Sequence, residues 1–434
     1  MMVINRLNNR KSNRIWMILL YVILLICYYP IFSNGFLDAW DDQWMVMNAY
    51  TEKGWNLTNV YAILTQPHHG QYSPLVQLNY LLLHSLCGYN PMAYHLMSFV
   101  WHTACVTVLY FFLQHTFCDK AESKHCTLVI VLTTTIFAVQ PVQVESVAWV
   151  SAQKVLMYSF FYLSAILFYV KYTKQKQLPF YLLTLLCFLC SVLCKEQAVV
   201  LPCTLFLMDW FTRRDWKDLD VWLEKLPFVV ISIGFAYLTW KMQHERSEIL
   251  LFTLPQRVVF CCYSLFEYIT KSLLPINLNY LYPFPMMDNS TDIPFRFYTY
   301  PFWTGALIMC LYYYRHNRIL IFGSLFFLIH LLPILHIIPL PRTGIVADRY
   351  MYIPIIGILL LFSNSVAYLV NKWHTKVCRI ILGCSVFVYI GYMCAYTHSY
   401  CSKWKDTDSV KSYLRGFYIE QSEMQSKDGC KLIH

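Results

Sequence analysis

The residues best placed to do chemistry are two adjacent carboxylates, Asp41 and Asp42, in the segment Phe36–Trp44. A long apolar run, residues 15–33, ends shortly before them and is predicted to be a membrane helix. Carboxylates at the boundary between lipid and water suit an enzyme in which one of them takes a proton from an acceptor hydroxyl. An acidic loop that only caps a helix has the same pattern, and position alone gives the two interpretations equal weight.

Further charged residues lie near the ends of later apolar runs. Glu145 and Lys154 are expected at membrane depth or just above it, where charge is costly and usually faces a cavity or a partner. The alternative is an internal Glu–Lys pair that only fixes helix packing. Lys195 could meet a phosphate as a point charge, or it could extend its amine to water.

The segment 338–354 contributes two arginines, Arg342 and Arg349. A fork-shaped guanidinium matches the oxygens of a phosphate or phosphodiester, so we predict that Arg349 binds phosphate. Asp348 either orients Arg349 or neutralises it. The adjacent pair His68 and His69 is only weak evidence for a metal, because neighbouring residues seldom chelate one ion together.

The composition indicates where these residues are held. Hydrophobic residues make up 58% of the 434 residues and charged residues 13%, whereas a soluble domain carries about 25% charged residues. We therefore predict an all-α polytopic membrane protein with one transmembrane domain, residues 1–400, and a short outer tail, residues 401–434. The candidate spans are 15–33, 93–113, 126–140, 154–170, 178–194, 197–211, 226–242, 298–314, 319–338, 350–370 and 379–397.

Basic residues set the predicted orientation. Lys and Arg favour cytoplasmic loops, and the basic loops of this chain fall on one side only if the ambiguous run 258–274 does not cross. This interpretation gives about eleven spans, with the N-terminus inside and the C-terminus outside. The net charge of +10 then belongs largely to inner loops, which make a poor groove for nucleic acid.

Two outer segments are expected to shape a substrate site. The first outer loop, about 34–92, is rich in aromatic residues and is predicted to form short amphipathic helices at the membrane surface. The stretch 274–285 contains three prolines and cannot be a regular helix. Irregular backbone at this depth requires protein or a water-filled cavity around it, so this stretch could line a substrate groove.

Several motifs together resemble a known family. In order along the chain they are Asp41-Asp42, His69-Gly-Gln-Tyr-Ser-Pro-Leu75, Asn90-Pro-Met-Ala-Tyr-His95, Pro141-Val-Gln-Val-Glu-Ser-Val-Ala-Trp-Val-Ser151, Lys195-Glu-Gln197 and Ala347-Asp-Arg-Tyr-Met-Tyr-Ile-Pro354. Over about residues 30–410 the chain resembles the transmembrane-and-tetratricopeptide-repeat O-mannosyltransferases and their bacterial relatives, in the GT-C superfamily of glycosyltransferases. It departs from them at Gln140-Pro-Val-Gln143, where His-Pro-Val-His is frequent, at Ser73, where Arg is frequent, and in lacking the repeat array.

The resemblance implies an inverting transfer of a sugar, mannose or a similar hexose, from a polyprenyl-phosphate donor to a hydroxyl of a protein or glycan acceptor on the non-cytoplasmic face. Asp41 would be the general base, Asp42 would position the acceptor or stabilise positive charge, and Glu145 would contribute from the opposite wall. Arg349, Lys195, Arg342 and Lys154 would hold the donor phosphate. His69, Tyr72 and Asp348 would bind the acceptor or the sugar. A divalent metal is compatible with this chemistry but not required.

The sequence leaves two other functions open. A lipid-linked polysaccharide polymerase or ligase shares the outer basic residues and the many spans, and a non-catalytic multi-pass membrane protein shares the fold alone. The compact loops favour a bacterial inner membrane, with the endoplasmic reticulum as the alternative location. The partners implied in either case are the lipid bilayer, the lipid-phosphate sugar and the acceptor, with no nucleic acid.

Overall fold

The computed structural model describes residues 2–117, 124–244, 252–285, 292–337, 344–373 and 375–416. Throughout these ranges the chain forms helices joined by loops, without a β-strand, and its only β-type pairings there are the isolated bridges His68–Gln71 and Tyr282–Val346. The predicted all-α fold is therefore confirmed.

Six helices of the described chain are long and apolar enough to cross a membrane. Each spans at least 18 residues, close to the roughly 20 residues that a bilayer core requires. The elements that carry them are α1 (Met2–Tyr28) with η1 (Tyr29–Ser33), α6 (Pro91–Phe117), η3 (Val150–Ala152) with α9 (Gln153–Gln175), α12 (Leu219–Leu223) with α13 (Leu226–His244), α17 (Ile355–Lys372), and α18 (Lys376–Cys401) with η7 (Ser402–Trp404).

A seventh candidate is broken in the middle. Helix α7 (Lys124–Val139) is followed by η2 (Pro141–Gln143) and α8 (Val144–Ala148), and the axis bends by 48° between the two parts. Pro141 explains the break, because its ring removes a backbone donor and clashes with the preceding turn. The bend places Glu145 on a short, separately oriented helix.

The remaining apolar helices are shorter. They are α10 (Leu178–Val192), η4 (Glu196–Val200) with α11 (Leu201–Thr212), η5 (Phe295–Thr299) with α15 (Tyr300–Tyr313), and α16 (Arg318–Leu331). Length and composition thus identify six or seven spans, and the figure of about eleven stays a prediction that counts these shorter helices as well.

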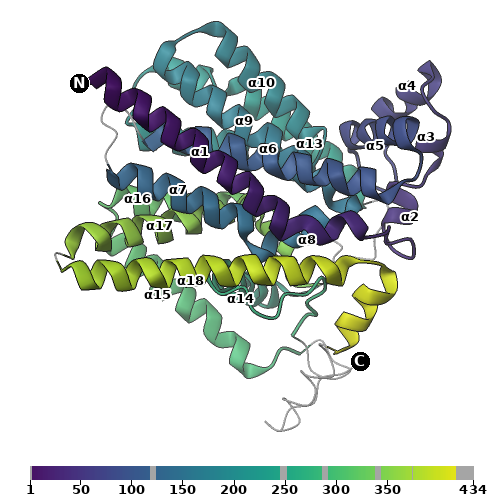
Figure 1. The fold of residues 1–434 in the computed structure, drawn as a ribbon. Helices are drawn as coiled ribbons and strands as arrows, with labels where there is room; N and C mark the ends of the chain where they lie inside the picture. The colour runs from purple at the N-terminus through teal and green to yellow at the C-terminus, as the bar shows by residue number, and fades with distance from the viewer. Residues whose placement is uncertain are drawn as a thin grey trace.

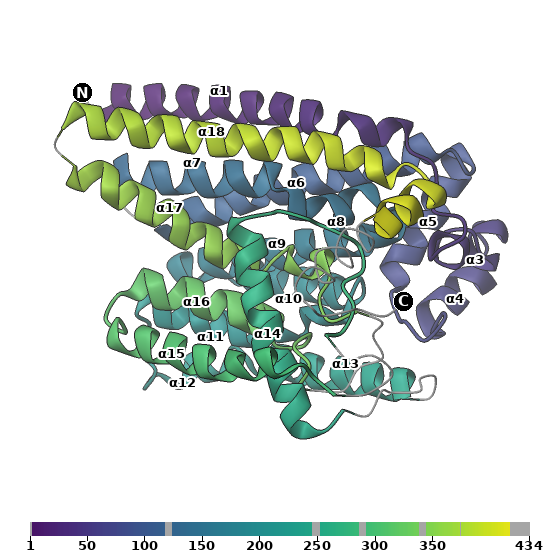
Figure 2. The ribbon, with the colours of Figure 1, turned by 90° about the horizontal axis from the view of Figure 1, so that it is seen from below.

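The long helices lie side by side between the same two ends of the molecule (Figures 1 and 2). One end, which we call the loop end, carries α2 (Asp42–Met45), α3 (Ala49–Glu52), α4 (Leu57–Thr65), α5 (Pro74–Cys87) and the described C-terminal residues. The N-terminus and the turn between α17 and α18 lie at the opposite end, which we call the N-terminal end. The short helices expected between residues 34 and 92 are therefore present.

Hydrogen bonds between the predicted basic loops show that these loops lie together at the N-terminal end. Lys174 donates to the carbonyl of His115 at the end of α6, and Arg318 donates to the carbonyl of Phe211 at the end of α11. The end of α17 reaches the start of α7 through the Asn371–His125 contact of 3.0 Å. These loops share one side, as the charge pattern predicts, and which side faces the cytoplasm stays a prediction.

Helix α14 (Leu254–Leu273) runs across the direction of the long helices (Figure 2). It carries three charged residues, Arg257, Glu267 and Lys271, and is not among the helices that qualify as spans. This arrangement agrees with the interpretation that the run 258–274 does not cross.

Helices α16 and α17 touch through their backbones at two glycines. A methyl group added at Gly357 would collide with the backbone oxygen of Gly323, and one added at Gly323 would lie 2.8 Å from the backbone oxygen of Gly357. Only a residue without a Cβ fits at this crossing. The short helix η6 (Asp348–Met351) comes directly before α17, so the crossing also fixes where Asp348 and Arg349 lie.

Candidate active site

A buried ion pair between Glu145 and Arg349 joins two distant parts of the chain at the loop end. Glu145 is fully buried on α8, and its Oε2 atom accepts a 2.6 Å hydrogen bond from the backbone N–H of Arg349 on η6. The Arg349 Nη1 donates to Glu145 Oε1. The pKa of Arg349 lies above its ordinary value because the charge of Glu145 outweighs the effect of burial, so the guanidinium stays charged.

The Arg349 guanidinium has N–H donors that no described residue uses. Arginine carries five N–H donors, and within the described chain only Nη1 of the Arg349 side chain is bonded. The group is 25% exposed and lies over two rings, with its carbon 5.1 Å from the centre of Tyr350 and 5.4 Å from that of Trp149. Unused donors on a fixed, partly exposed fork are what an oxyanion requires.

Lys195 stands beside this pair without a hydrogen-bond or ion-pair partner among the described residues. Its ammonium lies 5.3 Å from the ring centre of Tyr350 and 5.7 Å from that of Tyr158, and only 4% of the residue is exposed. Burial and the nearby charges of Lys154 and Arg349 lower the pKa of Lys195 to about 7, although Glu196 and Glu145 act in the opposite direction. A buried ammonium without a partner can bind an anion.

A tight turn brings Lys154 into the same region. Lys154 donates a 2.8 Å hydrogen bond to Oε1 of Gln71. The turn His68–Gln71 closes through two backbone hydrogen bonds, with left-handed backbones at His69 (φ 48°) and Gly70 (φ 74°). The Glu145–Lys154 pair that the sequence left open is absent, because each residue has a different partner.

The two adjacent carboxylates have different surroundings. Asp42 is fully buried. Its oxygens accept hydrogen bonds from the backbone of Leu37 at 2.8 Å and of Ser151 at 2.9 Å, and from the Ser151 hydroxyl. Burial raises the pKa of Asp42 to about 6. Asp42 therefore fastens α2 to η3.

Asp41 is only half-buried and occupies the N-cap position of α2, where its side chain makes no capping hydrogen bond. Its side chain accepts one hydrogen bond, from Trp44 Nε1 at 3.3 Å. The carboxylate is close enough to Lys154 and Arg349 to interact with both electrostatically. A half-buried carboxylate within electrostatic reach of two cations is the arrangement that the general-base prediction requires.

Asp348 does not neutralise Arg349, because Glu145 fills that role. Asp348 is buried, and its Oδ1 accepts a 3.0 Å hydrogen bond from the Tyr282 hydroxyl. Its Oδ2 has no hydrogen-bond partner in the described chain. Burial and the charge of Glu145 raise the pKa of Asp348 to about 8, against the opposing charge of Lys271.

The remaining predicted residues are less directly connected. His69 is exposed and lies against Trp44, with ring centres 4.9 Å apart. The Tyr72 hydroxyl donates to the carbonyl of Leu64 at 2.7 Å, and burial raises its pKa. Arg342 lies outside the described residues.

Several contributors were missed by the reasoning from sequence. They are the partner of Lys154, the partner of Asp42 and the rings under the cations, namely Gln71, Ser151, Trp149, Tyr158 and Tyr350. All but Tyr158 lie inside the motifs quoted above, so membership of a motif was the available signal. In the described part of the chain, no group of three or more His, Cys, Asp or Glu residues is arranged to hold a metal ion.

Comparison with known proteins confirms the resemblance that the motifs predict. The chain is 34% identical to protein O-mannosyl-transferase TMTC3 of Mus musculus over 137 residues, which are 30% of this chain and 14% of that protein. It is 30% identical to TMTC2 of Mus musculus over 179 residues (40% and 21%) and 27% identical to TMTC1 of Homo sapiens over 212 residues (44% and 23%).

The matches are partial. No protein-family model matches the chain, and the chain spans less than a quarter of the length of these curated relatives. With its apolar helices, the chain is a multi-pass membrane protein related to proteins named as protein O-mannosyl-transferases.

Proposed function

We propose that this protein is a GT-C-type glycosyltransferase that moves a hexose, mannose or a close analogue, from a polyprenyl-phosphate donor to a hydroxyl group of a protein or glycan. One observation carries the proposal. Asp41, from the first outer loop, lies within electrostatic reach of Arg349, which comes from the other end of the chain and keeps free N–H donors. In the proposed site, Asp41 is the base and Arg349 is the cation that binds the phosphate.

The reaction that fits this site is a single displacement. The acceptor oxygen attacks the anomeric carbon, and its proton passes to the carboxylate of Asp41. The bond from the anomeric carbon to the phosphate oxygen breaks, and the phosphate leaves with the electron pair. Attack opposite the leaving group inverts the anomeric centre. General-base catalysis of this kind typically contributes about 10²–10⁴-fold.

The cations act mainly on the leaving group. A polyprenyl phosphodiester carries one negative charge, and the departing monoester develops a second. Arg349, Lys195 and Lys154 therefore stabilise the transition state more than the bound donor, which is the condition for catalysis. Since side chains provide this positive charge, the proposed reaction requires no metal.

Glu145 and Asp42 position these groups. Glu145 holds the backbone and the side chain of Arg349, which leaves the outer edge of the guanidinium for phosphate oxygens. Asp42 holds the start of α2, the helix that Asp41 directly precedes. The acceptor is expected to approach from the side of His69 and Tyr72.

The proposed site lies on the non-cytoplasmic face, as the charge pattern predicts. Two membranes remained open from the sequence, the bacterial inner membrane and the endoplasmic reticulum. The animal sources of the named relatives favour the second.

The direct test is the Asp41→Asn variant of the full chain in lipid nanodiscs, supplied with a panel of polyprenyl-phosphate monosaccharides. The wild-type protein should consume one donor, and Asp41→Asn should lose about 10²–10⁴-fold in turnover while still binding it. Asp38→Asn is the matched control, because Asp38 is exposed in the same segment and its hydrogen bond from Thr407 survives in the amide. Transfer by Asp41→Asn at the wild-type rate would remove the general base from the proposal.

A further inference from the structure

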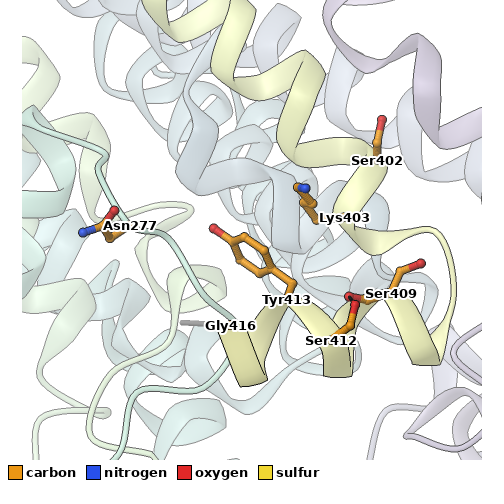
Figure 3. Close-up of a pocket in the computed structure, with 7 residues that line it drawn as sticks. All are labelled: Asn277, Ser402, Lys403, Ser409, Ser412, Tyr413 and Gly416. Atoms are coloured by element: carbon orange, nitrogen blue, oxygen red, sulfur yellow. Dashed lines mark hydrogen bonds between the residues drawn. The ribbon is translucent and has the colours of Figure 1, made fainter. Parts of the chain in front are cut away.

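A second polar site lies near the proposed active site, at the C-terminal side of the loop end. It is a cavity of about 450 Å³, within the range of roughly 300–1,000 Å³ that is typical of small-ligand pockets. One wall is the loop after α14, and the other is η7 with the helical segment 407–416 (Figure 3). The polar side chains that line it are Asn277, Ser402, Lys403, Ser409, Ser412 and Tyr413.

The chemistry of the lining limits what can bind. Among the described residues that line it, hydroxyl and amide groups predominate, none is a carboxylate, and Lys403 is the one charged side chain. A cationic ligand would find no counter-charge among these described residues, and a lipid tail would face polar groups. A neutral molecule with many hydroxyl groups matches the lining, because hydroxyls and amides both donate and accept hydrogen bonds.

Hydrogen bonds fix the pocket to the segment that carries the proposed base. Gly35 donates to the carbonyl of Lys405 at 2.8 Å, and Thr407 donates to Asp38 at 3.0 Å. Asp38 and Asp41 are three residues apart. The C-terminal wall of the pocket is therefore held against the run that leads into α2.

A layer of aromatic rings connects the pocket to Arg349. Tyr413, in the pocket wall, is 6.0 Å from Tyr400, and Tyr400 is 6.3 Å from Trp404, measured between ring centres. Trp404 stacks at 6.1 Å on Trp149, the ring over which Arg349 lies. A series of ring contacts thus runs from the wall of the pocket to the ring beside the guanidinium of Arg349.

A second connection runs through hydrogen bonds to Asp348. The Tyr413 hydroxyl donates to the carbonyl of Leu278 at 3.1 Å. The next residue, Asn279, donates its backbone N–H to the Tyr282 hydroxyl at 2.7 Å, and that hydroxyl donates to Asp348. An occupant that contacts Tyr413 therefore touches a chain of groups that ends beside the proposed sugar-transfer site.

We propose that this pocket is a carbohydrate subsite that holds a neutral saccharide, the glycan portion of the acceptor. The role as an acceptor site rests on the proposed glycosyltransferase function, whereas saccharide binding at the pocket does not. The proposal predicts that the protein favours acceptors that already carry sugar residues.

Binding is tested without any donor, by calorimetric titration of the full-length protein in detergent. The probes are mannotriose, a ten-residue serine- and threonine-rich peptide without sugar, and inorganic phosphate. Mannotriose should bind the wild-type chain. Ser412→Trp, which fills the pocket, should weaken this binding at least ten-fold, as should Asn277→Gly, which keeps the left-handed backbone at φ 54° while removing the amide. Asp408→Trp is the control, because Asp408 is exposed on the same helical segment and does not line the pocket.

Each alternative outcome has a distinct meaning. If the peptide binds and Ser412→Trp abolishes that binding while mannotriose does not bind, the pocket is a peptide site and the proposal fails. If phosphate displaces mannotriose and Lys403→Met removes both, the pocket is an anion site and the proposal fails. The absence of binding by all probes also overturns it. Saccharide binding by a wild-type protein that consumes no donor of the panel would count against the proposed function alone.

Discussion

The two ends of helix α9 carry contrasting groups of charges. The helix is about 35 Å long at 1.5 Å per residue. Near its end at residue 175, Asp209 accepts hydrogen bonds from Tyr169 at 2.8 Å and is paired with Lys225 and with Arg214. Glu224 is bonded there as well, by Arg214 at 2.7 Å and by a tyrosine of α9. Both of these carboxylates thus have several donors.

The charges at the loop end are matched less completely. Glu145 pairs with Arg349, but Lys195 has no polar partner in the described chain and Asp41 accepts one weak hydrogen bond. Buried polar groups are nearly always satisfied in native proteins. The fully paired charges at the N-terminal end indicate a structural role. The incompletely paired charges at the loop end indicate a site where a ligand supplies the missing partners.

The largest expected effect is that of Arg349→Met. It removes the phosphate clamp, so the transfer rate should fall by about 10³-fold, and it leaves Glu145 buried without its cation, at a cost of about 3–5 kcal/mol in the free energy of unfolding. Initial rates and thermal unfolding measure the two effects. The double variant Glu145→Gln, Arg349→Met should recover stability but not activity. Recovery of activity as well would show that Arg349 is only structural.

Lys225→Met tests the charges at the N-terminal end, which are assigned a structural role. Loss of Lys225 from the Asp209 network should lower the free energy of unfolding by about 3 kcal/mol, the scale of a broken buried pair. The rate per folded molecule should not change, because this network lies far from the proposed site. Lys217→Met is the control, since Lys217 is exposed near the same network. A fall in specific activity as large as that of an active-site variant would contradict the structural assignment.

Lys195→Met should behave in the opposite way to Lys225→Met. Stability should be kept or raised, because no ion pair is lost, while the donor KM should rise about ten-fold, as expected for one lost charge contact. In the wild-type chain the ammonium is charged below about pH 7 and neutral above it, so donor affinity should fall as the pH rises through 7.

The predicted pH dependence of donor affinity has a separate control variant. Lys195→Arg keeps its charge and should show no such fall in donor affinity. Since the pKa of Lys195 lies below its ordinary value of 10.5, its titration stabilises the fold as the pH rises from about 7 to 10.5, so unfolding cannot mimic the effect. A pH profile that is identical in the wild type and in Lys195→Arg would argue against phosphate binding by Lys195.

The smallest effect is expected for Asp348→Asn. With a pKa of about 8, Asp348 carries a proton at neutral pH, and an amide has the same shape and charge. Activity at pH 7 should therefore be unchanged. At saturating donor, where the charge of Lys195 no longer limits binding, the wild-type rate should fall above pH 8 and the rate of the variant should not. Rate measurements between pH 6 and 9 decide this. A large loss at pH 7 would mean that Asp348 acts as an anion.

The sequence predicted the layout better than the pairings. Length and apolar character place the first span within a residue or two of Arg14–Ser33, and the prolines of 274–285 correctly exclude a regular helix. The lateral arrangement of short helices such as α10 cannot be read from periodicity. Whether they cross depends on their neighbours, so the count of about eleven spans stays open.

The hydrogen-bond and ion-pair partners of the carboxylates could not be predicted from the sequence, for a physical reason. Asp41 and Asp42 are adjacent, yet α2 begins between them and directs one to a buried donor set and the other to the cations. Glu145 could pair with Lys154 by proximity along the chain, but the break at Pro141 turns Glu145 toward η6 instead. Such choices are made by tertiary contacts between segments hundreds of residues apart.

The glycine contact between α16 and α17 has a consequence for how this chain can vary. Neither Gly323 nor Gly357 is a residue of the proposed site, yet one extra carbon atom at either would push the two helices apart. Because only the turn at residues 352–354 separates η6 from the start of α17, a shift of α17 would move the guanidinium of Arg349 away from Glu145. The position of Arg349 at the loop end thus depends on the absence of a Cβ atom at the crossing of α16 and α17. A substitution at either glycine would lower activity although every residue of the proposed site is intact.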